Sequence, residues 1–178
     1  RYKDINADGV LDWRDQVEIG KSTTPNWMFG LGGSLKYKGW DMNVLLQGAF
    51  GHYNSIQLEQ GPLFAQIVYN ERWTEENNTA DALFARLGRS SSNAKPTDFY
   101  FKKADYIRLK AISLGYTMPA NWLKNGPFGK IKLYVSGNNL FTISSLLKYN
   151  LDPESPSGNA GRYYPQQRVL NMGISASL

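Results

Sequence analysis

Five segments of the chain alternate apolar and polar side chains with the two-residue period of a β-strand. They cover about Trp27–Tyr37, Trp40–Phe50, Tyr106–Thr117, Lys130–Thr142 and Arg168–Leu178. Each is about 10 to 12 residues long, the length of a strand that crosses an outer membrane with one face toward lipid. Because a strand crosses lipid only when both its edges are paired, five such strands imply a larger closed structure.

The connections between these segments are alternately short and long. Lys38–Gly39 is a two-residue hairpin signal, and Asn125–Gly126–Pro127 marks another short turn region. In outer-membrane barrels the short turns are periplasmic and the long loops are extracellular. The pattern therefore predicts barrel strands within residues 26–178. It also predicts extracellular loops at residues 1–25 and at about 51–103 and 143–165.

The third segment changes phase part-way along its length. Ile107, Leu109 and Ala111 are apolar at odd positions, whereas Ile112 and Leu114 continue the apolar pattern at even positions. A β-bulge in this strand explains the change, and so do apolar side chains that face a plug inside the barrel. The sequence leaves both explanations open.

Composition agrees with a barrel and excludes several other classes. The chain has 17 Gly and is 13% aromatic, which suits strands with aromatic girdles and irregular loops. It has no run of 18 apolar residues, and so no transmembrane helix is expected. The lack of Cys excludes disulfides, and the net charge of +5 is too scattered for a nucleic-acid-binding face. The chain opens at Arg1 inside a polar motif without a signal peptide, which predicts a piece of a longer protein.

A soluble β-sandwich is the competing architecture, because its strands also alternate and its loops are also long. Strands in sandwiches usually have about 5–6 residues. The longer segments here favour the membrane, whereas a carbohydrate-binding or adhesion module with a calcium-stapled loop remains the alternative function.

Several ordered blocks of the chain resemble SusC/RagA-type TonB-dependent outer-membrane receptors of Bacteroidota. The blocks begin with the segment from Asp4 to Asp12 and Ile19–Gly20 with Pro25, and continue with Arg72–Thr74 and Asn77. The later ones are Tyr106–Lys110, Leu114–Pro119, Val135–Phe141, Asp152–Glu154, Gly161 and Tyr164–Pro165. No single block is decisive, but their order along nearly the whole chain is specific. One departure is the terminal Leu178, where such barrels usually end in Phe.

The resemblance implies an all-β fold: the last five antiparallel strands of a transmembrane barrel of about 22 strands with a plugged lumen. It also implies a role in importing large nutrients, oligosaccharides or peptides, through the outer membrane. The partners that it implies are a SusD-like surface lipoprotein, the rest of the barrel and the plug, and TonB, which acts through upstream sequence. Outer-membrane lipid would surround the strands.

One motif carries sharp chemistry, and it lies at the start of the chain. The spacing D-x-N-x-D-G, with an acid at position twelve, reproduces a calcium-binding loop. Asp4, Asn6, Asp8, Asp12 and Asp15 would supply side-chain oxygens and Val10 a backbone carbonyl, which matches the oxygen ligands of Ca²⁺. Four Asp in one short loop would repel each other without a cation. The sequence therefore predicts a structural Ca²⁺ site, with a solvated Asx-turn loop as the alternative.

The remaining candidates have no partners that would make a catalytic site. The only histidine, His52, follows a predicted strand, and no Cys or second His is available to join it, which predicts an ordinary surface or interface position. The long central loop contains Tyr69, Trp73, Phe84 and a pair at Phe99–Tyr100, which predict either a small loop core or a stacking surface for a sugar or a lid protein. No hydrolase, zinc-protease or phosphate-loop motif is present in the sequence, and an enzyme is not expected.

Overall fold

The computed structural model describes residues 2–56, 59–60, 63–76, 82–87, 97–124, 126–156, 163–164 and 166–178. Four positions of the motifs and turns predicted above, Asn77, Asn125, Gly161 and Pro165, lie outside these residues. All five predicted strands lie within them.

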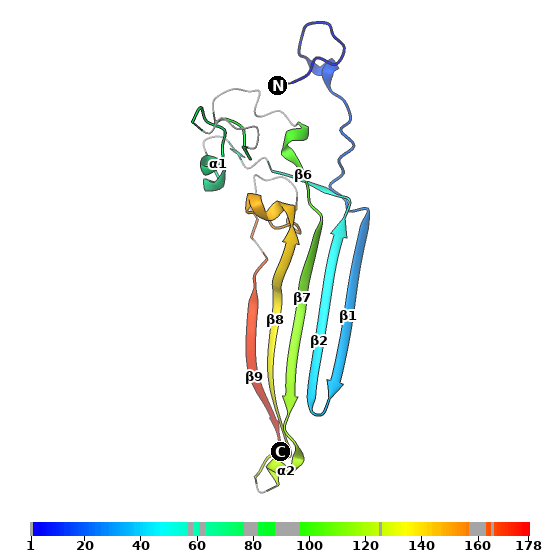
Figure 1. Ribbon diagram of the computed structural model, residues 1–178, viewed down its shortest axis with the longest axis vertical. Coiled ribbons are helices and arrows are strands. Elements are labelled where there is room, and N and C mark those ends of the chain that lie inside the picture. Colours follow the sequence, from blue (N-terminus) through cyan, green and yellow to red (C-terminus); the bar gives the residue numbers. More distant parts are fainter. Residues whose placement is uncertain are drawn as a thin grey trace.

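A five-stranded antiparallel sheet forms the body of the structure (Figure 1). In the order β1-β2-β7-β8-β9, the strands are Trp27–Tyr37, Trp40–Phe50, Tyr106–Thr117, Lys130–Ser144 and Val169–Ser177. The first three have the predicted bounds. Strand β8 continues past the predicted Thr142 to Ser144, and β9 is one residue shorter than predicted at each end.

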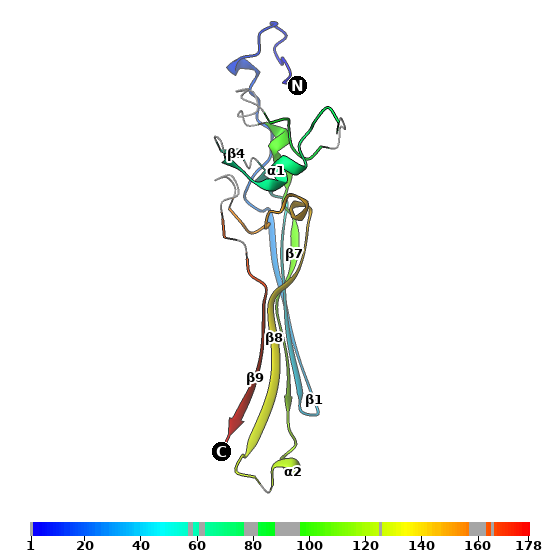
Figure 2. The same cartoon turned by 90° about the vertical axis from the view of Figure 1, so that its left-hand side faces the viewer.

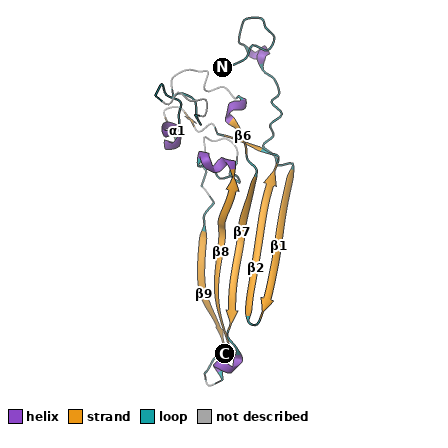
Figure 3. Ribbon diagram, in the orientation of Figure 1, coloured by secondary structure: helices purple, strands orange, loops and turns teal. Residues whose placement is uncertain are grey.

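The other elements are short and lie in the connections (Figure 3). Two small antiparallel pairs join β3 (Tyr53–Ser55) with β6 (Phe101–Lys103), and β4 (Glu59–Gln60) with β5 (Leu63–Phe64). The helices are η1 (Trp13–Asp15), α1 (Gln66–Asn70), η3 (Asp98–Tyr100), α2 (Ala120–Leu123) and η4 (Ser145–Tyr149). No described helix is long and apolar enough to cross a membrane.

The predicted hairpin between β1 and β2 is confirmed, and its turn explains its sequence. Lys38 has φ 45° and Gly39 has φ 89°. Two successive residues with positive φ are typical of a type I′ turn, whose twist matches that of the strands that it joins. The turn sets a register in which Tyr37 lies opposite Trp40 and Trp27 lies opposite Phe50.

A β-bulge at Lys110 accounts for the change of phase in β7. Leu45 and Leu46 of β2 pair with Ala111 and Leu109, so that Lys110 is the extra residue. The pairing of β7 with β8 shifts at the same place. As a result Ile107, Leu109, Ile112 and Leu114 lie on one face of the sheet, whereas Ala111, opposite Leu45, lies on the other face.

The sheet is one layer thick, and the hydrophobic core lies beyond its end (Figure 2). Seven residues form this core: Ile56, Val68, Phe84, Tyr100, Ala104, Leu146 and Tyr149. The first five belong to the connection between β2 and β7, and the last two belong to η4, which follows β8. The two long connections therefore pack against each other, and we call this packed region the loop cap. In Figure 1 it lies at the opposite end of the sheet from the β1–β2 turn and α2.

Candidate functional site

Strand pairing divides the side chains of the sheet between two faces, because residues directly opposite each other in neighbouring strands project to the same side. Met42 pairs with Leu35 and Leu114, and Leu114 in turn pairs with Val135, which pairs with Met172. We call the face that carries this row the outer face. Its large apolar side chains are solvent-exposed in the isolated chain, for example Leu31 at 62% and Ile174 at 71%.

Aromatic side chains lie at both ends of the outer face. Trp27 is opposite Phe50 at the loop-cap end, and Phe50 stacks on Phe29 with ring centroids 5.9 Å apart. At the other end Trp40 packs against Tyr116, with centroids 4.8 Å apart. An apolar band between two aromatic rows is typical of a strand surface that contacts a lipid bilayer.

A soluble sandwich would need a second sheet packed on this apolar face. The two other sheets in the described part of the chain have only two strands each, and the apolar side chains of β1 are all exposed. The alternative architecture therefore has no support from the described residues.

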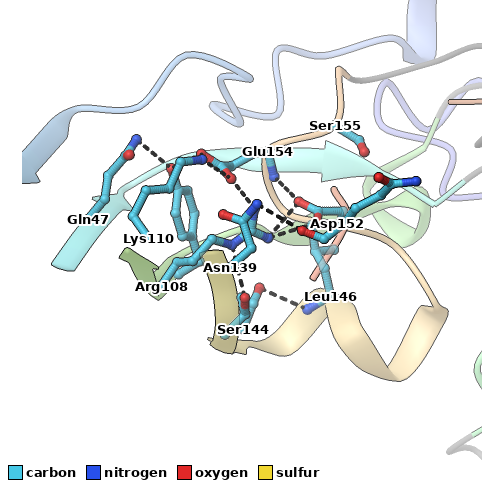
Figure 4. A network of polar contacts seen from close by, with 12 residues as sticks. Gln47, Arg108, Lys110, Asn139, Ser144, Leu146, Asp152, Glu154 and Ser155 are labelled. Carbon is cyan, nitrogen blue, oxygen red and sulfur yellow. Dashed lines mark hydrogen bonds and ion pairs between the residues drawn. The ribbon is translucent and has the colours of Figure 1, made fainter. Parts of the chain in front are cut away.

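The opposite face, which we call the inner face, is polar. Close to the loop cap it contains a cluster of largely buried charged side chains (Figure 4). Arg108 of β7 is only 2% exposed. Its Nη2 donates hydrogen bonds of 2.8 Å to both carboxylate oxygens of Asp152, and its Nη1 forms an ion pair with Glu154. Its Nε donates a bond of 2.9 Å to Thr142 Oγ1 of β8, which fixes the plane of the guanidinium.

Lys110 and Tyr106 also contact Glu154. Lys110 Nζ lies 3.1 Å from each of its carboxylate oxygens, and the hydroxyl of Tyr106 donates a bond of 3.2 Å to Oε1. Gln47 of β2 donates to the same hydroxyl over 3.4 Å. Two cations thus face two carboxylates, and we call these four side chains, Arg108, Lys110, Asp152 and Glu154, the ion cluster.

The acidic residues of the cluster belong to a compact turn, Asp152–Ser155. The backbone N–H of Glu154 donates to Asp152 Oδ1 over 2.9 Å, and the N–H of Ser155 donates to the Asp152 carbonyl over 3.0 Å. From β3, the amide of Asn54 donates a bond of 3.0 Å to the Ser155 carbonyl. In the sequence these acids stand out only as part of a block that resembles the receptor family. The available signal was the pair of cations, Arg108 and Lys110, in a strand whose other face is apolar.

His52 lies beside this turn and is buried, so that of the two predicted positions, surface or interface, the surface position is wrong. Its exposure is 6%, and its ring packs edge-on against Tyr106 with centroids 6.4 Å apart. Its Nδ1 is buried without a hydrogen-bond partner among the described residues. Burial lowers the pKa of His52, whereas the nearby Asp105 carboxylate and the backbone of Pro153 act in the opposite direction. A single histidine is no sign of burial in a sequence, and only the packing of the loops reveals it.

The aromatic residues of the central loop divide between buried and exposed positions. Phe84 and Tyr100 belong to the buried core of the loop cap, and Phe84 meets Tyr149 at a ring distance of 5.9 Å. Tyr69 is 51% exposed and Phe99 is 37% exposed. The loop core is therefore confirmed, and exposed rings remain beside it.

The N-terminal segment folds into a loop closed by its own carboxylates. Asp4 accepts hydrogen bonds from the backbone N–H groups of Ala7 and Gly9, over 2.6 and 2.8 Å. Asp15 accepts from those of Ile5 and Asp12. These bonds lower the pKa of its carboxyl, and the bond from Asp12 has the largest effect. Gly9 has φ 81°, which only glycine adopts without strain.

The other predicted calcium ligands follow the same scheme. Asn6 accepts from the N–H of Asp8, and Asp8 from the N–H of Val10. Arg14 lies 3.5 Å from Asp8 and 3.4 Å from Asp12, so that part of the repulsion between the four carboxylates is relieved within the loop. In the described part of the chain, no group of three or more His, Cys, Asp or Glu side chains is gathered as a metal site. The calcium site stays a prediction.

The chain is similar over nearly its whole length to TonB-dependent receptors. It is 30% identical to TonB-dependent receptor P26 of Formosa agariphila, a match that covers 99% of this chain and 19% of the relative. It is also 28% identical to the TonB-dependent receptor SusC of Bacteroides thetaiotaomicron, over 98% of this chain and 17% of SusC. These matches relate the chain to TonB-dependent receptors, SusC among them.

Solved structures agree on the fold. The RagAB peptide importer in its "open-open" state superposes with a TM-score of 0.69 at 22% identity, over 95% of this chain and 19% of that one. A second structure, of the RagAB peptide transporter, gives 0.68 at 23% identity, over 94% and 19%. No protein-family model matches the chain. The five strands are a segment of an outer-membrane barrel wall, and the chain spans only about a fifth of the length of the relatives that it matches.

Proposed function

We propose that this chain contributes wall strands and extracellular loops to an importer in the outer membrane of a Bacteroidota-like bacterium. The outer face supports the proposal most directly. Its apolar residues stay in register across five strands and end in aromatic rows, although nothing in the described chain covers them. Lipid is the surrounding that makes such a face favourable.

The cargo that we propose is a large nutrient, either an oligosaccharide or a peptide. RagAB is a peptide importer, and SusC is a TonB-dependent receptor. By analogy with these relatives the complete protein would work with a SusD-like lipoprotein as a lid and would take its energy through TonB. The remaining barrel strands and the plug would come from other parts of the receptor. Transport, and not catalysis, is the proposed activity.

Uptake by living cells tests this function. The gene for the complete receptor is deleted, and the accumulation of labelled peptide pools and labelled oligosaccharide pools is compared before and after complementation. One of the two pools should fall to background in the deletion strain, and it should fall equally in a strain without functional TonB. Normal uptake of both pools in the deletion strain would contradict the proposal.

Purification of the tagged receptor tests the proposed lid. Receptor extracted in mild detergent should carry a surface lipoprotein in a constant ratio, identified by mass spectrometry. A receptor that imports cargo without any bound lipoprotein would contradict the proposed lid and leave the proposed import function standing.

We also propose that the N-terminal loop binds Ca²⁺ as a structural ion. An accepted N–H bond leaves each carboxylate oxygen a further lone pair, and so the hydrogen bonds within the loop do not use up the oxygens that Ca²⁺ requires. Hydrogen bonds that Asp4 and Asp15 accept from backbone N–H groups already bend the loop into a closed shape. The ion would stabilise this shape and would take no part in transport chemistry.

A further inference from the structure

The ion cluster is one contact between the loop cap and the inner face of the sheet. The acidic turn Asp152–Ser155 follows η4, whose Leu146 and Tyr149 are buried in the core of the loop cap. The turn itself is held against β7 by the ion cluster and against β3 by one bond from Asn54. The same short segment thus joins the loop cap to the sheet.

Burial makes this contact close to all-or-none. Arg108 is 2% exposed, and the side chains of Asp152 and Glu154 are 13% and 15% exposed. If the turn moved away alone, a buried guanidinium would lose both of its carboxylate partners. Removing one partner of a buried ion pair is strongly destabilising, because the other charge stays behind without compensation.

The cluster is also complete within this chain. Arg108 and Lys110 balance Asp152 and Glu154, and Thr142 and Tyr106 supply the remaining hydrogen bonds. Arg108 and Lys110 are two residues apart in β7, so that the normal alternation of the strand already directs both cations toward the same turn, and the bulge changes the phase only after them. No lid, plug or cargo is needed to satisfy these charges.

We infer that the acidic turn Asp152–Ser155 is an electrostatic latch that fixes the loop cap to the inner face of the sheet, with Arg108 as its anchor. While the latch is closed, the loop cap and the neighbouring strands move as one body. Opening requires the whole turn to leave together. The latch rests on contacts within the chain and does not depend on the proposed transport function.

Hydrogen exchange of the complete receptor in detergent, followed by mass spectrometry, tests the latch. In the double variant Asp152→Asn/Glu154→Gln, amides of residues 145–156 should exchange about tenfold faster or more, while β7 and β8 keep their protection. Adding Arg108→Met should bring exchange back toward the wild-type rate, because the uncompensated buried charge is then gone. Asp41→Asn, which breaks an ion pair on the same face nearer the β1–β2 turn, is the matched control and should leave residues 145–156 unchanged.

Three results would contradict the inference. Unchanged exchange at residues 145–156 in the double variant would show that the hydrophobic core alone holds the loop cap in place. Equal loss of protection in β7 and β8 would show that the ion cluster supports the wall itself and is no latch. A triple variant that exchanges as fast as the double one would likewise remove Arg108 from its role as the anchor.

Discussion

Lys132 of β8 and Asp41 of β2 form an ion pair of 2.8 Å, although β7 lies between their two strands. The pair crosses β7 at Gly115, which is opposite Asp41 in the register. A Cβ atom at Gly115 would lie 2.4 Å from Lys132 Cε and 2.9 Å from Asp41 Oδ1. Glycine at this position therefore keeps the path between the two charges open.

Gly115→Ala should consequently destabilise the receptor. The added methyl group overlaps the lysine stem and forces the ammonium away from Asp41, at a cost of about 1–3 kcal/mol, as for other overpacked sites. Unfolding in denaturant, followed by tryptophan fluorescence of the complete receptor, measures the change.

Gly30→Ala is the matched control for this substitution. Gly30 lies on the same inner face, and a Cβ atom there meets nothing within 4 Å. The control should be neutral or slightly stabilising, since alanine loses less backbone entropy than glycine. Equal effects of the two substitutions would mean that the ion pair does not depend on the space at Gly115.

Charge on the outer face should be penalised by lipid. Ile174 lies opposite Leu133 on this face, whereas its neighbour Ser175 projects to the inner face opposite Lys132. Ile174→Arg should cost about 2–4 kcal/mol if it lies near the bilayer midplane, and Ser175→Arg should cost less. The folded fraction of the complete receptor in lipid vesicles, read from its heat-dependent gel mobility, checks this difference. Equal tolerance of the two arginines would mean that the two faces are assigned the wrong way round.

Local periodicity was enough to predict the strands, because each one shows its two faces in its own sequence. The bounds of β1, β2 and β7 agree with the prediction, and the bulge in β7 was visible as a change of phase. The loop cap could not be predicted in this way. Its core joins Val68 and Phe84 to Tyr149, and the bond from Arg108 to Asp152 spans 44 residues, distances at which a sequence pattern carries no information about contacts.

The N-terminal loop shows the same division between local and distant information. The hydrogen bonds of Asp4 and Asp8 link residues two to five positions apart, which is why a short motif could predict a closed loop there. The burial of His52 depends instead on the turn at Asp152–Ser155 and on Asp105, about a hundred and about fifty residues further on. Nothing near His52 in the sequence indicates either neighbour.

Acid should loosen the packing of the loops around His52. Burial lowers its pKa in the folded state, so that the neutral ring is favoured by folding. The resulting stability is present above the ordinary histidine pKa of about 6.5 and is lost as the pH falls below it toward the folded-state value. Tyr106 packs edge-on against the ring, and the Asp105 carboxylate, the charged group that acts on His52, opposes the effect of burial without reversing it.

Hydrogen exchange of residues 50–56 and 145–156 at pH 7.5 and pH 5.5, corrected for the intrinsic rate, measures this effect. Exchange should be faster at the lower pH in the wild-type receptor, and the difference should shrink in His52→Gln, which has no group that titrates in this range. A pH response that persists in the variant would assign the effect to other groups, such as the nearby carboxylates.

Calcium should order the N-terminal loop without affecting the barrel wall. If Asp4, Asn6, Asp8, Asp12 and Asp15 surround Ca²⁺ together with the Val10 carbonyl, chelation or Asp8→Ala should increase exchange at residues 2–20 and leave β1 and β2 protected, since the loop lies beyond the end of the sheet (Figure 1). Calorimetry of the complete receptor with added Ca²⁺ measures the binding, and anomalous scattering from crystals locates the ion, with oxygen contacts at about 2.3–2.6 Å.

Glu18→Ala, which changes an acidic residue outside the motif, is the control for calcium binding and should leave the binding heat unchanged. If the loop stays ordered in chelator and no binding heat is observed, the bonds from Asp4 and Asp15 to the backbone are sufficient to close it, and the motif is only a turn.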